Sequence, residues 1–169
     1  MPAERVPPPV QPRAGQESVW DDPRPPRLEP TTRRVRVVLG GLPIADSRRA
    51  LRVLETSHPP TYYIPPQDVL AGCLVAEPGI GSVCEWKGAA RSFTVVAGGR
   101  SVSRGAWSYP HPTPAFAPLA DYVAFYVRSM DACYVDDELV RPQPGGFYGG
   151  WITSDVVGPF KGEPGSEAW

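Results

Sequence analysis

Alternating apolar and basic side chains are clearest in Arg33-Arg34-Val35-Arg36-Val37-Val38-Leu39-Gly40-Gly41-Leu42-Pro43-Ile44-Ala45-Asp46. Val35, Val37 and Leu39 share one face of an extended chain, because successive side chains of a strand point to opposite faces. The pair Gly40-Gly41 supplies the backbone freedom of a tight turn, and Ile44 resumes the apolar pattern after it. The segment therefore predicts a β-hairpin with one buried face.

Similar short segments follow along the chain, separated by Gly and Pro. Residues 50–55 fit a third strand or a short helix, and one helical turn fits residues 67–70. A longer helix is expected from Pro118 to Tyr126, where apolar residues recur at helical spacing. Further strands are expected at 73–77, 83–86, 92–96 and 106–109, with a closing hairpin over 133–140. Short, closely spaced strands predict an antiparallel sandwich or barrel.

The N-terminal part of the chain differs in composition. Residues 1–30 hold nine of the 23 prolines and almost no apolar periodicity. We interpret residues 1–16 as a disordered proline-rich tail. Residues 17–32 are expected to be an extended lead-in that Trp20 pins to the fold, and residues 33–169 a single domain.

Composition excludes several classes of partner and site. The net charge of −1 provides no field that attracts nucleic acid or an anionic membrane. No apolar run is long enough to span a bilayer, and no secretory leader is evident, so a cytoplasmic protein is predicted. Three cysteines and two histidines lack the paired spacing of a structural zinc site, so no metal or cofactor is expected. The sequence does not set the oligomeric state.

Several separate motifs give the chain a family resemblance. They are Leu54-Glu55, Pro59-Pro60-Thr61-Tyr62-Tyr63-Ile64-Pro65, Cys84-Glu85-Trp86-Lys87-Gly88, Trp107-Ser108-Tyr109-Pro110 and Phe147-Tyr148-Gly149-Gly150-Trp151. In this order they resemble the domain of unknown function family 427, over roughly residues 33–160, with residues 17–30 resembling the lead-in of actinobacterial members. The family is sometimes labelled nucleotidyltransferase-like.

The resemblance implies a fold. It is a single, mainly β domain similar to the β-tent class, in which two antiparallel sheets meet at an angle, as in methionine sulfoxide reductase B. One or two short helices are expected beside the sheets. Relatives of this class bind small cyclic ligands between aromatic rings, which by analogy implies a pocket here.

Candidate ligand-binding residues are aromatic or charged. If Glu85-Trp86-Lys87 lies on a strand, Glu85 and Lys87 point to one face and present a carboxylate and an ammonium to a ligand. The alternative for these two is a cross-strand ion pair of little energetic weight. Aromatic residues could line the same pocket or form ordinary core. The predicted ligand-binding set is Tyr63, Glu85, Trp86, Lys87, Tyr109, Tyr148 and Trp151.

Three hypotheses for function remain open. The first is a domain that binds an unknown small molecule in an aromatic and charged pocket. The second is an enzyme acting on a nucleotide or similar substrate, with Glu55 or Glu85 as acid or base and Lys87 beside negative charge; here His58, three residues after Glu55, is a further candidate. The third is a protein-interaction module that recruits its partner through the proline-rich tail.

Overall fold

Antiparallel sheets dominate the computed structural model, which describes residues 6–169. The mainly β prediction is therefore confirmed. The largest sheet has the strand order β11 (Ala124–Phe125), β10 (Arg100–Ser108), β9 (Gly88–Ala97) and β7 (Leu74–Ala76), and β8 (Ser82–Cys84) also pairs with β9. A four-stranded sheet has the order β13 (Glu138–Leu139), β12 (Ala132–Val135), β3 (Val35–Leu39) and β4 (Leu42–Ser47).

Smaller sheets complete the fold. One contains β2 (Arg27–Pro30), β5 (Leu51–Leu54) and β6 (Thr61–Tyr63), so residues 50–55 form a strand, not a helix. Another pairs β14 (Arg141–Pro142) with β15 (Trp151–Ile152). The last pairs β1 (Glu17–Ser18) with β16 (Val156–Val157), in parallel.

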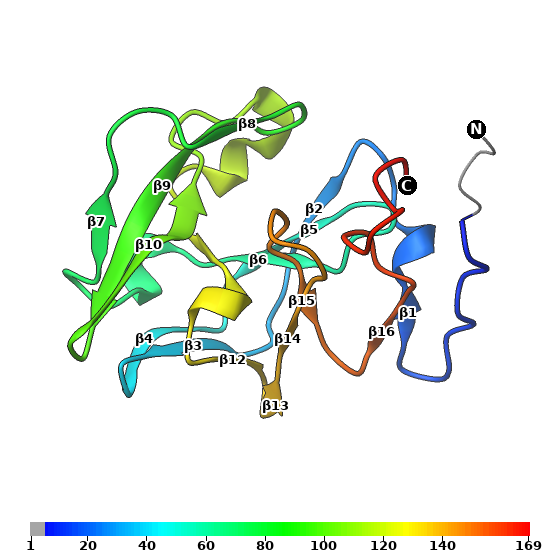
Figure 1. The fold of residues 1–169 in the computed structure, drawn as a ribbon, viewed down its shortest axis with the longest axis horizontal. Helices are drawn as coiled ribbons and strands as arrows, with labels where there is room; N and C mark the ends of the chain where they lie inside the picture. The colour runs from blue at the N-terminus through cyan, green and yellow to red at the C-terminus, as the bar shows by residue number, and fades with distance from the viewer. Residues whose placement is uncertain (1–5) are drawn as a thin grey trace.

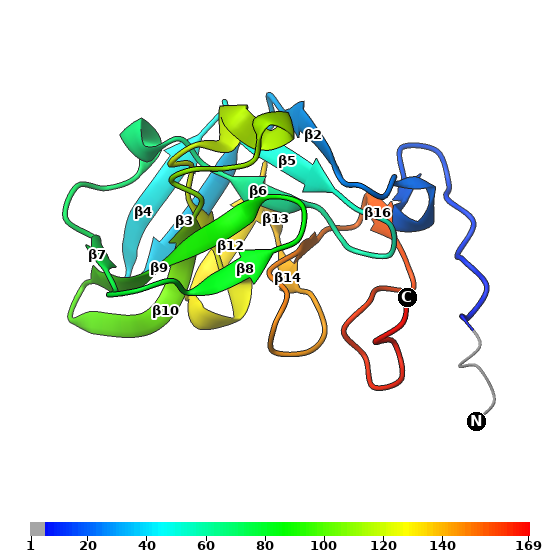
Figure 2. The ribbon, with the colours of Figure 1, turned by 90° about the horizontal axis from the view of Figure 1, so that it is seen from above.

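The two largest sheets touch at the turns of their hairpins. A Cβ on Gly40 would lie 2.2 Å from the Ala97 oxygen, and one on Gly98 would lie 2.0 Å from the Gly40 oxygen. Both glycines also have positive φ, so two backbone turns meet where no side chain fits. The β3–β4 and β9–β10 hairpins converge at these turns and diverge beyond them (Figure 1). Figure 2 shows the same arrangement from above.

A single large apolar cluster lies between the diverging sheets. The inward residues of the predicted first hairpin, Val35, Val37 and Leu39, are fully buried in it, as the alternation predicted. Trp151 is also fully buried here, and its ring centroid lies 5.1 Å from that of Tyr62. A second cluster around Tyr63 and Leu119 lies beneath the cavity described below.

The lead-in lies along the domain. Its β1 strand is followed by η1 (Val19–Asp21), and the Trp20 indole N–H donates to the Pro159 oxygen at 2.8 Å. The preceding residues 6–16 form no strand or helix, although the Val10 N–H donates to the Gly158 oxygen at 2.8 Å. Residues 1–5, the start of the predicted disordered tail, lie outside the described residues. The first described residues and the C-terminus lie on the same side of the molecule (Figure 1).

The prediction of a helix from Pro118 to Tyr126 is wrong. A 3-10 helix, η3 (Pro114–Leu119), ends one residue after Pro118, where the predicted helix was to start. Asp121 then has φ +64°, which no right-handed helix allows. Val123 then bridges Ile64, and β11 pairs with β10. Burial of Ala124 and Phe125 against the sheet thus overrides the local helical pattern. The other described helices are short 3-10 turns, η2 (Pro66–Asp68) and η4 (Val127–Ser129).

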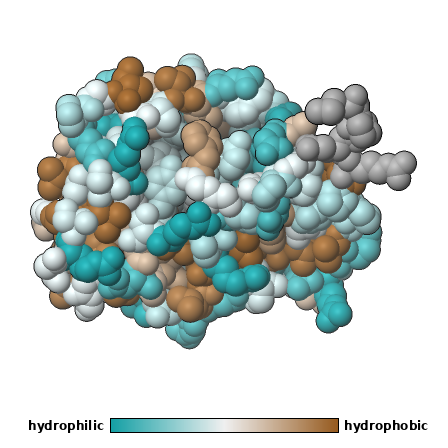
Figure 3. Space-filling view, viewed as in Figure 1, coloured by the Kyte–Doolittle hydropathy of each residue, from teal (hydrophilic) through white to brown (hydrophobic). Residues whose placement is uncertain are grey.

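No helix among residues 6–169 is long and apolar enough to cross a membrane. On the face seen in Figure 3, hydrophilic and hydrophobic residues are interspersed.

Candidate functional site

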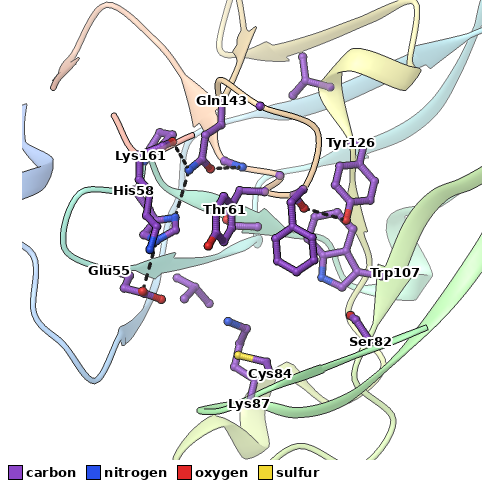
Figure 4. A pocket seen from close by; sticks show the side chains of 18 of the residues that line it. Glu55, His58, Thr61, Ser82, Cys84, Lys87, Trp107, Tyr126, Gln143 and Lys161 are labelled. Carbon is purple, nitrogen blue, oxygen red and sulfur yellow. Dashed lines mark hydrogen bonds and ion pairs between the residues drawn. The ribbon is translucent and has the colours of Figure 1, made fainter. Parts of the chain in front are cut away.

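A cavity of about 740 Å³ opens between three parts of the chain. One is the β8–β9 hairpin, the second is the connection from β5 to β6, and the third is the loop from β14 to β15. Figure 4 shows side chains from all three pointing into the same space. Pockets that hold small ligands generally measure about 300–1,000 Å³, so the cavity is of suitable size for one.

Glu55, His58 and Gln143 form one wall, which we call the dyad wall. Glu55 Oε2 lies 3.3 Å from His58 Nε2, and also 3.3 Å from a guanidinium nitrogen of Arg24 in the lead-in. His58 Nδ1 lies 3.1 Å from Gln143 Nε2. The predicted pair of Glu55 and His58 does meet, because the turn before Pro59 places Ser57 at φ +70° and folds the chain back.

Gln143 connects this wall to the backbone. Its Nε2 donates to the Lys161 oxygen at 2.9 Å, and its Oε1 accepts from the Gly150 N–H at 3.0 Å. The side chain is almost completely buried, so each of these bonds is made away from water. The amide thereby fixes the β14–β15 loop, the C-terminal segment and His58 relative to one another.

The carboxyl group of Glu55 is held in its charged form. Burial alone would raise the pKa of Glu55, but the contact with His58 and the charges of Arg24 and Lys87 outweigh burial and lower it. A carboxylate with a lowered pKa is a good hydrogen-bond acceptor and a weak base.

Cys84, Glu85, Trp86 and Lys87 form the opposite wall, which we call the hairpin wall. The expectation that Glu85-Trp86-Lys87 lies on a strand is wrong, because these residues are the turn between β8 and β9. Gly88 follows with φ +108°, and Thr113 binds the turn through its N–H to the Lys87 oxygen and its hydroxyl to the Trp86 oxygen. The turn leaves Glu85 exposed and Lys87 buried, instead of placing both on one face.

Lys87 is the distinctive residue of the hairpin wall. It is only 9% exposed, and its ammonium points from the hairpin into the cavity (Figure 4). Within residues 6–169 no carboxylate forms an ion pair with it and no group accepts a hydrogen bond from it. Its ammonium lies 5.7 Å from the centroid of the Tyr109 ring, and its charge acts on Glu55 only from beyond ion-pair distance. Removing a charge from water without giving it a partner destabilises the folded protein.

Aromatic rings line the remainder of the cavity. Tyr63, Trp107, Tyr109 and Tyr148 all face it, in addition to Trp86. Burial raises the pKa of both Tyr63 and Tyr109, so these phenols stay protonated. Of the predicted ligand-binding residues, Tyr63, Glu85, Trp86, Lys87, Tyr109 and Tyr148 line the cavity, whereas Trp151 lies in the core outside it.

Gly149 lets the loop approach Trp107. A Cβ on Gly149 would lie 2.2 Å from Trp107 Cη2, so any side chain there would displace the indole. Gly146 in the same loop has nothing within 4 Å of such a Cβ. The close approach to Trp107 is therefore made at Gly149 and not at Gly146.

Positive side chains outnumber negative ones around the cavity. The lining acids are Glu55 and Glu85, and the lining cations besides Lys87 are Arg24, Arg104, Arg128 and Lys161. Lys161 donates to the Trp169 oxygen at 3.2 Å, and Arg104 lies 3.9 Å from Glu77. Among the described residues there is no group of three or more His, Cys, Asp or Glu side chains arranged to hold a metal ion.

Comparison with known protein families identifies one relationship. Residues 27–136 match the model of the domain of unknown function DUF427, NTP_transf_9, which is more than half of the chain. The chain belongs to this family. Among curated proteins no match was found. The DUF427 region contains Glu55, His58 and Lys87, while Arg24 and Gln143 lie outside it.

Proposed function

We propose that this DUF427 protein binds a small anionic molecule that carries a flat ring. The observation that carries the proposal is Lys87, whose side chain is only 9% exposed and whose ammonium faces the cavity without an ion-pair partner among the described residues. A ligand anion that fills the cavity beside Lys87 displaces water and pairs with its charge, and an ion pair shielded from water is stronger than one at the surface.

The surroundings of Lys87 support the same class of ligand. Arg24, Arg104, Arg128 and Lys161 add positive charge around the cavity and favour an anion over a neutral molecule. Tyr63, Trp107, Tyr109 and Tyr148 offer faces and edges against which a ring can pack.

Catalysis on such a ligand is the second candidate function. The contact between Glu55 and His58 inside the cavity favours it, because paired carboxylate and imidazole groups serve in acid–base chemistry. The lowered pKa of Glu55 argues for a binding role of this carboxylate instead. Binding is therefore the function we favour.

A thermal-shift experiment with matched probes tests the proposal. Each anion is compared with its neutral counterpart: adenosine 5′-monophosphate with adenosine, uridine 5′-monophosphate with uridine, and 4-hydroxybenzoate with 4-hydroxybenzamide. A probe present at about 100 times its Kd adds about 2.7 kcal/mol to the free energy of unfolding, which raises the Tm by roughly 5–10 °C. We expect shifts from an anion and not from its neutral counterpart.

Lys87→Met is the decisive variant. Truncating one partner of a buried charge pair generally costs about 2–5 kcal/mol, so the Kd of the binding anion should rise about 30-fold or more. The matched control is Arg91→Met, which removes a positive charge from exposed Arg91 on β9, outside the cavity. Equal shifts from charged and neutral probes, an unchanged Kd in Lys87→Met, or no shift from any anion would contradict the proposal.

A further inference from the structure

The hydrogen bonds of Gln143 determine where the proton of His58 lies. A side-chain amide has one accepting end and one end with two N–H groups. The Gly150 N–H must face the oxygen of Gln143, and the Lys161 carbonyl must face its nitrogen, because backbone groups have fixed donor and acceptor roles. Turning the amide over would place two donors together at Gly150 and two acceptors together at Lys161.

With this orientation, Gln143 presents an N–H to His58. One hydrogen of Nε2 goes to the Lys161 oxygen, and the other points to His58 Nδ1 at 3.1 Å. Nδ1 must therefore accept, and a neutral imidazole that accepts at Nδ1 carries its proton on Nε2. The protonated Nε2 then lies 3.3 Å from Glu55 Oε2 (Figure 4).

We infer that Gln143 is a positioning residue that locks neutral His58 in its Nε2–H form, so that His58 orients Glu55 and Glu55 meets the ligand. In this form the only basic lone pair of His58 is on Nδ1, where it accepts from Gln143, so it is not free to take a proton from a bound molecule. Glu55 uses Oε2 for both His58 and Arg24, and within residues 6–169 Oε1 has no partner.

The lock narrows the class of ligand, a step that rests on the proposed function. An ionised carboxylate only accepts hydrogen bonds. A molecule that places its anion near Lys87 and fills the cavity toward Glu55 must therefore present an N–H or O–H group to Oε1. The ligand class is an anion that also bears such a donor on its ring or side chain.

Two-bond ¹H–¹⁵N NMR spectra of the histidine rings, recorded without any ligand, test the lock. At pH 8, where an ordinary imidazole is neutral, we expect His58 to show a fully protonated Nε2 and an unprotonated Nδ1. The exposed His111 is the only other histidine and serves as a reference for a freely exchanging mixture in the same spectrum. A proton on Nδ1 of His58 in the wild-type protein overturns the inference, whatever any variant does.

Two variants separate Gln143 from Glu55 as the cause. In Gln143→Leu the lock is removed, and the His58 signals should move toward the averaged pattern of His111. In Glu55→Gln the side-chain oxygen still accepts from Nε2, so the Nε2–H form should persist. The opposite result, averaging in Glu55→Gln and no change in Gln143→Leu, overturns the role of Gln143. These spectra contain no ligand, so they test the tautomer of His58 alone. Anion binding is tested separately by the thermal-shift experiment.

Discussion

The dyad wall and the hairpin wall face each other across one cavity, yet they satisfy their polar groups differently. Gln143 and His58 bind backbone and side-chain groups of the protein at both ends. Lys87 has no such partner among the described residues. The comparison indicates that the dyad wall maintains the shape of the cavity, whereas the hairpin wall carries a charge that, under the proposed function, a ligand compensates.

The largest effect should come from breaking the dyad wall. Gln143→Leu leaves the Gly150 N–H, the Lys161 oxygen and His58 Nδ1 without their partner. At about 1 kcal/mol for each lost bond, the free energy of unfolding should fall by about 3 kcal/mol, measurable by urea denaturation. The control is Gln67→Leu, at an exposed glutamine without side-chain hydrogen bonds, which should change stability little. Equal losses in both variants would contradict the role given to Gln143.

A second experiment tests the β14–β15 loop, which lies against Trp107 through Gly149. In Gly149→Ala the new methyl group meets Trp107 and must displace it, which should cost about 2 kcal/mol of stability and alter tryptophan fluorescence. Gly146→Ala is the matched control, because its methyl group enters open space. If the two alanines behave alike, the close approach of Gly149 to Trp107 does not constrain the cavity.

Substitution in the hairpin wall should increase the stability of the protein, whereas substitution in the dyad wall should decrease it. Lys87→Met removes a charge on a side chain that is 9% exposed and has no ion-pair partner in residues 6–169, so without ligand the free energy of unfolding should rise by about 1 kcal/mol. Urea denaturation of both proteins measures the difference. A clear loss of stability would mean that Lys87 serves the fold, and the contrast between the two walls would disappear.

The smallest effect is the pH dependence contributed by Glu55. Its pKa is lower in the folded protein than the ordinary value of 4.5. A lowered pKa stabilises the fold above the unfolded-state pKa, and this contribution is lost as the pH falls through the folded-state value. The stability difference between wild type and Glu55→Gln should therefore be constant from pH 7 to about 5 and shrink below about pH 4.5. A difference that grows toward acid pH would contradict the charged state of Glu55.

Strand prediction from the sequence succeeded where alternation and turn residues agreed. The first hairpin and the closing hairpin over residues 132–139 lie where the pattern placed them. Two local patterns misled. The helical spacing after Pro118 was overridden by burial of Ala124 and Phe125 on the sheet. Glu85-Trp86-Lys87 was expected to continue a strand, but it forms a turn, and no turn residue within it marked the end of the strand.

The site was predictable in its residue types more than in its geometry. Lys87, Tyr63, Tyr109 and Tyr148 do line one cavity, whereas Trp151, which was predicted with them, lies in the core. Gln143 escaped notice because its partner His58 is 85 residues away. Its position between Pro142 and Pro144, where a polar residue is held in rigid backbone, was the only local signal.

The boundary of the matched family region runs through the cavity itself. Glu55, His58 and Lys87 lie inside residues 27–136, but Arg24, Gln143 and the loop with Gly149 lie outside. A protein that shares only the matched region has Lys87 without the loop that shapes the space beside it. Under the proposed function, changes in these flanking segments would alter which ring is accepted and leave the preference for an anion unchanged.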